Sequence, residues 1–570
     1  MNKEDLREFF KHRMVEALHK DTLDSFRVRT NNSITILYEL SNVVEGWLEG
    51  HVKNFNTVES CINEAIDIIK RDESLIFPYY NKDLFIKKLI EFRKGAKEND
   101  VSTTKSIICL VDMLYSSNKD HYLLSILDKL SDSLNITEEI LDSDFITSLD
   151  KFNFDISSFC CELLRLGYSK VYLYNFFKAF LYNKKKESFK DAFNNMKSHF
   201  TNREKKGFHV IFKIEFTNRK SAENATTKID NIKESVPSEL QDHITKQNTY
   251  KITNERIRFY ITKKEALDSG MAIRLSYEEL SNDFDINLES INEVRTPSTA
   301  LIIADQNIRL EKIYYFDNGE NLVDTDEMTL GEAINRIKSK ENISKDILDR
   351  LHSSLRHLRI GDQQSEVEQR FINYWISIEF IFSSTHSKES TFERIKTFLP
   401  EILECSYVKR NILYMNKWLL GKKMISNNES WHDLNDDKKQ EILTSVDILT
   451  KYRLQKLKSH LHHKDKRKNY LQAHKTNVER HITRIYRLRN ELIHEAAIKQ
   501  DIANVTSNLR FYLVFILNQL ISFLLDDNKS LHEKEISHFF WMYDNLSNFI
   551  KTDYDLTKLM DVPLTEKFII

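Results

Sequence analysis

The chain has 570 residues, which is more than one hydrophobic core usually supports, so two to four domains are expected. Hydrophobic residues make up 41% and aromatic residues 11%, which excludes general disorder. The net charge of −2 alone does not point to a nucleic acid, while only 10 glycines and 5 prolines favour a mainly helical fold.

The cysteines and the apolar runs exclude several further classes of protein. No Cys-x-x-Cys pair occurs among the 5 scattered cysteines, so the sequence predicts neither a zinc knuckle nor a disulfide framework. The first residues are charged and lack the apolar centre of a signal peptide. The most apolar run, Phe511–Leu525, is shorter than the roughly 20 residues that a membrane span needs. We therefore expect a buried helix there, a cytoplasmic location and no membrane partner.

Residues 1–205 are predicted to form an N-terminal helical domain. Apolar residues recur at helical spacing in Leu6–Leu18, and Cys160–Tyr182 is predicted to form two helices around Gly167. Apolar stripes of this kind are usually the core of a helical bundle. No catalytic constellation stands out in this region.

Residues 206–318 are predicted to form a small central α/β domain. In Phe208–Phe216 and Ile257–Ile261 apolar and polar residues alternate, as expected of strands with one buried face. Such a domain suits a sensor, a lid or a docking platform, but its sequence names no ligand. The other expected elements are strands at Leu301–Ala304 and Ile308–Phe316 and helices at Ala222–Ser235 and Ala266–Leu288.

Residues 319–570 are predicted to be helical again. Gln369–Ser383 is apolar almost all round, as expected of a central helix, and Glu379 is the one charged residue in its interior. A polar connection around Ser426–Asp437 leads into a long helix from about Asp437, and an apolar helix follows at Leu509–Leu525.

A strongly basic segment precedes the last apolar helix. Between Lys451 and Arg489 the sequence has 13 Lys and Arg against two acids, a local charge of +11, so the rest of the chain sums to −13. Such a segment is either a solvated helix face or a surface that binds a polyanion, and its strong imbalance favours nucleic acid. Tyrosines within it offer rings for base stacking. The residues predicted to bind RNA are Arg480, Arg484, Arg487, Lys466, Arg467, Lys468 and Tyr486.

The segment ends in the sequence Arg489-Asn490-Glu-Leu-Ile-His494. On a helix with about 100° per residue, Ile482, Ile485, Leu488, Leu492 and Ala496 form one apolar stripe, and Arg489 falls inside it. Asn490 and His494 lie one turn apart on another face.

A charged group on an apolar stripe requires a partner, because an unpaired buried charge is costly. Glu379 poses the same problem on its own apolar helix, so we hypothesise that Glu379 and Arg489 meet. Their contact is compatible both with a structural ion pair between two helices and with a functional site that fixes the guanidinium beside His494.

The string Arg489-Asn490-x-x-x-His494 resembles the RNxxxH signature of HEPN-domain ribonucleases. The earlier helix that runs from Arg370 through Glu379 resembles the corresponding helix of Apea-like HEPN proteins, which adds Arg370 and Glu379 as supporting residues. The resemblance covers roughly residues 320–550, and it is weaker over residues 150–320. It implies a C-terminal HEPN-like helical bundle as the nuclease domain, at residues 319–570.

The resemblance implies metal-independent cleavage of RNA without a cofactor, as found in bacterial antiviral, abortive-infection and toxin systems. A ribose 2′-OH attacks the adjacent phosphorus, leaving a cyclic phosphate and a 5′-hydroxyl end. Arg489 would stabilise the phosphoryl oxygens, His494 would act as general acid or base, and Asn490 would orient phosphate or imidazole.

The resemblance also implies partners. HEPN proteins generally join two motifs across a dimer, so a homodimer is expected. Because unpaired bases can be splayed and stacked, a tRNA or mRNA loop is the preferred substrate. The large regions before residue 319 are expected to sense a trigger, such as a phage-derived protein, or to hold the nuclease inactive.

Two further stretches contain residue types that occur in metal or phosphate sites. The histidines of the basic segment lie among lysines without the HExxH spacing of a metal site, so no metal is expected. Lys422 and Lys423 follow a lone glycine, Gly421, without the pattern of a phosphate loop, so an NTPase is not predicted. A non-catalytic HEPN-type module that grips RNA or a protein remains the alternative function, and a structural adaptor that uses the α/β domain is a third.

Overall fold

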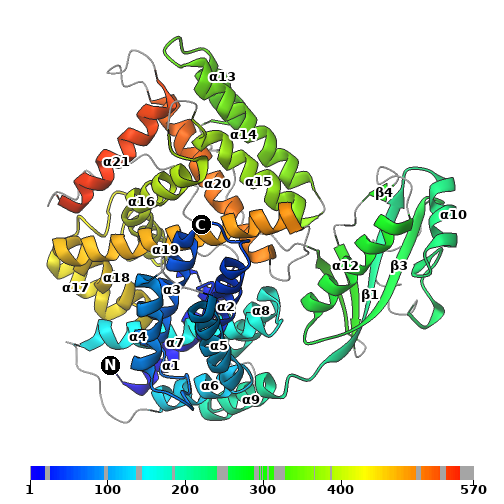
Figure 1. Ribbon diagram of the computed structural model, residues 1–570, viewed down its shortest axis with the longest axis horizontal. Coiled ribbons are helices and arrows are strands. Elements are labelled where there is room, and N and C mark those ends of the chain that lie inside the picture. The colour runs from blue at the N-terminus through cyan, green and yellow to red at the C-terminus, as the bar shows by residue number, and fades with distance from the viewer. Residues whose placement is uncertain are drawn as a thin grey trace. The chain divides into compact units, whose positions relative to one another are not determined.

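The structure is a computed structural model of the whole chain (Figure 1). It describes residues 2–19, 23, 26–27, 29–95, 101–135, 144–182, 187–240, 254–287, 294–295, 297, 299–304, 307–313, 328–364, 366–384, 388–495, 502–526 and 534–552. Helices dominate these residues and strands are confined to one small sheet, which confirms the predicted mainly α fold with a small α/β region.

The chain divides into two compact units. The first contains Met1–Tyr122, Asp132–Ile156 and Phe316–Ile570, and the second contains Leu123–Ser131 and Ser157–Tyr315. The predicted domains, residues 1–205, 206–318 and 319–570, do not coincide with these units. Most of the N-terminal helices belong to the same unit as the C-terminal bundle, although hundreds of residues separate them in the sequence.

Asparagine side chains begin several of the N-terminal helices. Asn2 and Asn32 each form a capping box, and Asn54 and Asn81 accept hydrogen bonds from backbone amides of the first turn. The predicted helix at Leu6–Leu18 is confirmed. The N-terminal helices are α1 (Lys3–Leu18), α2 (Ser33–Leu48), α3 (Phe55–Arg71), α4 (Lys82–Lys94), α5 (Val101–Asn118), α6 (Tyr122–Leu134), α7 (Phe145–Arg165), α8 (Lys170–Tyr182) and α9 (Phe189–Asn202).

The predicted break at Gly167 is also confirmed. Helix α7 ends at Arg165, Gly167 has a φ of 99°, and α8 begins at Lys170. This left-handed conformation is open to glycine without the steric cost that a side chain imposes.

The sheet is antiparallel with the strand order β2-β3-β1-β5-β6, and β4 pairs with the end of β1. Alternate residues of β1 point to opposite faces. Val210, Phe212 and Ile214 pack with residues of α10 and α12, while Ile211 packs with Phe259 on the other face. The elements are β1 (Lys206–Phe216), α10 (Arg219–Lys228), β2 (Ile232–Lys233), β3 (Ile257–Ala266), α12 (Ser269–Asn287), β4 (Val294–Arg295), β5 (Thr299–Ala304) and β6 (Asn307–Lys312).

Most of the predicted elements of this region are confirmed, with one error. The predicted helix at Ala222–Ser235 ends at Lys228, and Ile232–Lys233 instead forms a short strand that pairs with β3. Pairing with an existing strand edge outweighs local preference in so short a segment. The end of the predicted strand Ile308–Phe316 lies outside the described residues.

The C-terminal helices enclose one large core to which α14, α15, α16, α19, α20 and α21 all contribute. The predicted central helix at Gln369–Ser383 and the apolar helix at Leu509–Leu525 are confirmed as parts of α15 and α20. The helices are α13 (Leu330–Lys338), α14 (Lys345–Gln363), α15 (Val367–Phe382), α16 (Thr391–Gly421), α17 (Asp436–Ser445), α18 (Ile448–His462), α19 (Lys464–Glu495), α20 (Ile502–Leu525) and α21 (Ile536–Thr552).

The apolar helix α20 is the core helix that the sequence predicts. Within the described residues, Val505–Leu525 is long and apolar enough to cross a membrane, but 78% of its most apolar window is buried in the protein. Burial against other helices is the pattern of a soluble protein's core helix.

The predicted long helix from about Asp437 is wrong in one respect, because the structure divides the segment into three helices. Helix α17 ends at Ser445, and Asp447 starts α18 by accepting a hydrogen bond from the backbone N of Thr450 at 3.0 Å. His463, which has extended backbone angles, separates α18 from α19. Helix α19 therefore carries the end of the basic segment and the Arg489–His494 sequence on one continuous helix.

Candidate functional site around Arg489

Helix α19 presents the predicted apolar stripe to the core. Ile482 and Ile485 are fully buried, Leu492 is buried, and Leu488 packs against the same cluster. Ala496 lies outside the described residues. The stripe fixes the rotation of the helix, so it also determines where the polar residues between its members point.

The predicted contact between Arg489 and Glu379 is confirmed. Arg489 Nη2 lies 3.8 Å from Glu379 Oε1, and both side chains are partly buried, with exposed fractions of 26% and 31%. The same carboxylate oxygen accepts a hydrogen bond of 2.6 Å from Trp375 Nε1, one turn earlier on α15. Trp375 is fully buried and holds the Glu379 side chain in place. The long ion pair therefore connects α15 to α19, and the indole bond orients the Glu379 carboxylate within α15.

The guanidinium of Arg489 is only partly satisfied. Its Nη1 donates to Asn490 Oδ1 at 3.1 Å, and its buried Nε has no hydrogen-bond partner among the described residues. Arginine offers five donors, so this group has capacity left for an oxyanion. The backbone of His494 belongs to the last turn of α19, but its side chain lies outside the described residues. Residue 494 follows Asn490 by one helical turn.

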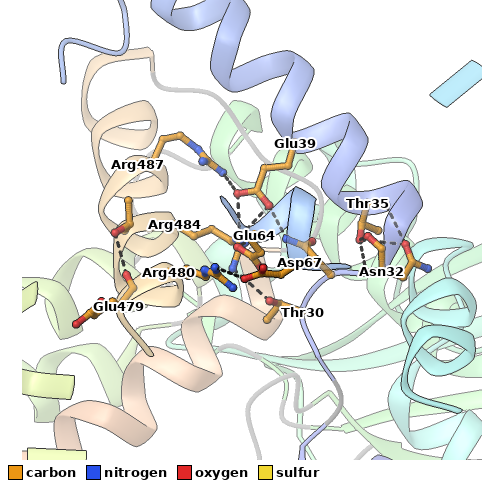
Figure 2. A network of polar contacts seen from close by, with 12 residues as sticks. Thr30, Asn32, Thr35, Glu39, Glu64, Asp67, Glu479, Arg480, Arg484 and Arg487 are labelled. Carbon is orange, nitrogen blue, oxygen red and sulfur yellow. Dashed lines mark hydrogen bonds and ion pairs between the residues drawn. The ribbon is translucent and has the colours of Figure 1, made fainter. Parts of the chain in front are cut away.

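Three of the predicted RNA-binding arginines of α19 contact acids of the N-terminal helices. Figure 2 shows Arg480, Arg484 and Arg487 directed towards α2 and α3. Arg484 Nε lies 2.9 Å from Glu39 Oε1 and Arg484 Nη2 lies 2.7 Å from Glu64 Oε2. Arg487 Nη2 lies 2.5 Å from Glu39 Oε1, and Arg480 Nη2 lies 2.6 Å from Asp67 Oδ2. We call these six residues the arginine clamp; they are Glu39, Glu64, Asp67, Arg480, Arg484 and Arg487.

Glu39, Glu64, Arg484 and Arg487 form the buried part of the clamp, whereas the Asp67 side chain is 59% exposed. Burial alone raises the pKa of Glu39, but Arg484 and Arg487 outweigh burial and bring its pKa down to about 2. Burial likewise lowers the pKa of Arg484, and Glu39 and Glu64 reverse that effect and raise it. Both partners therefore stay charged at neutral pH. Burial, followed by the charge of Glu39, raises the pKa of the neighbouring Cys61 thiol well above its usual value.

The remaining predicted RNA-binding residues fall into two groups. Lys466 and Lys468 are exposed at the start of α19, whereas Arg467 is buried. The ring of Tyr486 stacks on Phe392 with centroids 3.8 Å apart, so one of its faces is covered within the protein. RNA contact by these residues stays a prediction, and in this conformation the exposed lysines are the ones open to a polyanion.

Arg370, the second predicted supporting residue, has a local role at the start of α15. Its Nε donates to the backbone carbonyl of Gln364 at 2.6 Å. Burial raises the pKa of the nearby Asp362, but Arg510, Tyr374 and then Arg370 outweigh it, so the pKa is lowered overall. Arg370 thus helps to order the turn between α14 and α15.

Two histidines of the basic segment, His460 and His481, contact tyrosines. His460 stacks on Tyr470 with centroids 3.8 Å apart, and His481 Nδ1 lies 2.8 Å from Tyr512 Oη. Burial, then the charges of Arg484 and Arg27, lowers the pKa of His481 to about 3. Across the described part of the chain, no three His, Cys, Asp or Glu side chains are arranged to hold a metal ion.

Sequence reasoning missed Trp375 and the three acids of the clamp. A signal for Glu39 was present, because it is a lone carboxylate in the otherwise apolar and uncharged stretch Ser33–Val44, as Glu379 is in its own helix. The same question about a partner for the buried charge would have singled it out. Glu64 and Asp67 lie on a mixed helix face and carry no such signal.

Comparison with family models, with curated proteins and with solved structures gave no match for this chain.

Proposed function

We propose that the protein is a metal-independent endoribonuclease whose site is built on Arg489, Asn490 and His494. The observation that carries the proposal is the state of Arg489. Glu379 and Asn490 hold its guanidinium partly buried at the core, yet among the described residues they leave some of its five N–H donors unused. A fixed cation with unused donors is suited to a phosphodiester whose charge grows in the transition state.

The cleavage follows the chemistry that these residue types allow. The ribose 2′-OH loses its proton to a base and attacks the adjacent phosphorus. The bond to the departing 5′ oxygen breaks, and an acid protonates that oxygen, which leaves a cyclic phosphate and a 5′-hydroxyl. Arg489 neutralises the phosphoryl oxygens, and His494 exchanges the proton. Because one copy supplies one His494, two copies would bring together both an acid and a base, so a homodimer belongs to the proposal.

The arginine clamp supports a restrained resting state. Glu39, Glu64 and Asp67 give to Arg480, Arg484 and Arg487 the anionic partners that phosphates would otherwise supply. In the proposal a trigger, such as a phage protein in a bacterial host, displaces α2 and α3 and exposes these arginines to a tRNA or mRNA loop. Growth then stops through damage to RNA.

The test is cleavage of purified RNA, with matched DNA as control and a chelator present throughout. Wild type is expected to cut RNA only, whereas Arg489→Ala and His494→Ala lose about 10² to 10³ of the rate. His352→Ala, at an exposed histidine of α14, is the matched control and keeps full activity. Cleavage that requires a metal ion would contradict the proposal.

A second variant tests the restraint. Glu64→Gln keeps the size of the side chain but removes one charge of the clamp, and it is expected to raise the cleavage rate. Glu59→Gln, on the same helix outside the clamp, should leave the rate unchanged. If Glu64→Gln binds RNA more tightly but never cuts it, the non-catalytic binding module is the correct function.

A further inference from the structure

A second feature of the unit that contains α19 is a pocket that the nuclease proposal does not use. It encloses about 680 Å³ of space, part of it open to solvent. Residues from α1, α7, α16, α18 and α19 line it, so N-terminal and C-terminal elements build it together.

The charge of the lining is one-sided. Three cations, Arg13, Arg453 and Lys456, line the pocket, and no carboxylate is among the lining residues. The acids that neutralise them lie behind the wall. Glu16 pairs with Arg13 and Arg453, and Asp150 lies 2.6 Å from Lys456 Nζ. The surface that faces the pocket therefore has cations and no carboxylate, which favours an anionic ligand.

The other lining residues include aromatic side chains that carry hydroxyl or ring-nitrogen groups. Tyr407, Tyr452, Tyr470 and His460 supply flat surfaces, and the Tyr407 and Tyr470 hydroxyls share a hydrogen bond of 2.7 Å. Burial, then the charge of Lys456, lowers the pKa of His460 to about 4, so at neutral pH its ring is an uncharged donor and acceptor. Apolar side chains of α16 and α18 complete the pocket.

We propose that this pocket binds a nucleoside phosphate, with the phosphate near Arg13 and Lys456 and the base against the tyrosine-lined wall. The phosphate of such a ligand suits the cations of the lining, and its planar base, with polar groups at the edge, suits the tyrosine rings. The pocket is distinct from the nuclease site. Tyr470 and Arg489 lie 19 positions apart on α19, about 28 Å along the helix axis. A nucleotide in the pocket joins α1 and α7 to α18 and α19 and so stabilises the restrained state.

The test is calorimetric titration of the full-length protein with AMP and UMP, with adenosine and inorganic phosphate as partial ligands. The nucleotides are expected to bind at least about tenfold more tightly than either part. Lys456→Gln should weaken AMP binding by about tenfold or more, and Lys458→Gln, two residues away and outside the pocket, should not change it. Thermal unfolding checks that both variants are folded.

Titrations are repeated in the His494→Ala variant, because binding in the pocket does not depend on cleavage. An unchanged affinity there keeps the pocket proposal even if the protein proves not to be a nuclease. No binding of AMP or UMP at about 1 mM, or equal affinity in Lys456→Gln, would overturn it. Binding of short oligoribonucleotides but of no mononucleotide would also overturn it, because the pocket would then be an RNA contact.

Discussion

Arg484 and Arg489 lie five residues apart on one helix, and their surroundings differ sharply. Arg484 has an exposed fraction of 10% and bonds Glu39, Glu64 and Thr30 at distances from 2.7 to 3.2 Å. Arg489 has an exposed fraction of 26%, a 3.8 Å ion pair and one bond to its own neighbour. Every nitrogen of the first guanidinium donates to a partner and serves the structure, whereas the second guanidinium has fewer partners. The number of bonds around a charge thus separates a structural arginine from a candidate catalytic one.

The largest expected effect is on the stability of the clamp. Arg484→Ala leaves Glu39 and Glu64 buried beside fewer cations, so we expect the free energy of unfolding to fall by about 3–5 kcal/mol. Urea unfolding, followed by the circular dichroism signal of the helices, measures this loss in the free energy of unfolding. Arg219→Ala, which removes an exposed arginine of the sheet unit that also pairs with two acids, is the control and should be indistinguishable from wild type. Equal losses in the two variants would erase the distinction between buried and exposed pairs.

The second effect concerns Arg489. Since its ion pair is long and partly exposed, Arg489→Ala should change the free energy of unfolding by no more than about 1 kcal/mol. The same variant should lose RNA cleavage by about 10² to 10³ fold. Stability and initial cleavage rates are measured on one preparation. A large loss of stability without loss of activity would make Arg489 structural, like Arg484.

The third effect is a pH dependence of the clamp. The pKa of Glu39 is about 2 in the folded protein and has an ordinary value of 4.5. A lowered pKa stabilises the fold above the ordinary value, and this contribution disappears as the pH falls from about 4.5 towards 2. We expect Glu39→Gln to flatten the fall of the unfolding free energy in this window. Urea titrations at stepped pH test this, and an unchanged slope would show that Glu39 is not coupled to the arginines.

The smallest effect is expected for Trp375→Phe. The variant keeps the buried ring but removes the 2.6 Å hydrogen bond to Glu379, at a cost of about 1 kcal/mol. Because Glu379 positions Arg489, cleavage should fall by less than in Arg489→Ala. Activity and unfolding curves of the two variants, compared side by side, measure the difference. An activity loss as large as that of Arg489→Ala would give the indole a direct role.

Local patterns in the sequence predicted much of the fold. Alternation identified β1, and the apolar stripe of Ile482, Ile485 and Leu492 gave the rotation of α19. The contact of Glu379 with Arg489 followed from two buried charges that each lacked a partner. These inferences succeed because the pattern of apolar and charged residues on a single helix or strand face is enough to make them.

Inferences that require distant partners were less complete. A basic run predicts a surface for a polyanion, but the sequence does not state that the acids of α2 and α3 contact Arg480, Arg484 and Arg487. Those acids lie more than 400 positions earlier in the chain. Likewise, the short strand Ile232–Lys233 depends on an edge that β3 provides. Contacts between distant parts of the chain determine both features, and a local sequence pattern carries no information about such contacts.

Cys61 gives the clamp a chemical reporter. Its thiol is buried beside Glu39, and its pKa is raised well above its usual value, so little reactive thiolate forms while α2 and α3 contact α19. Cys109 is exposed and serves as the internal reference. The rate at which a thiol reagent modifies Cys61 therefore reports how often the clamp opens. A candidate trigger can be recognised by its acceleration of that single reaction, before any RNA is added.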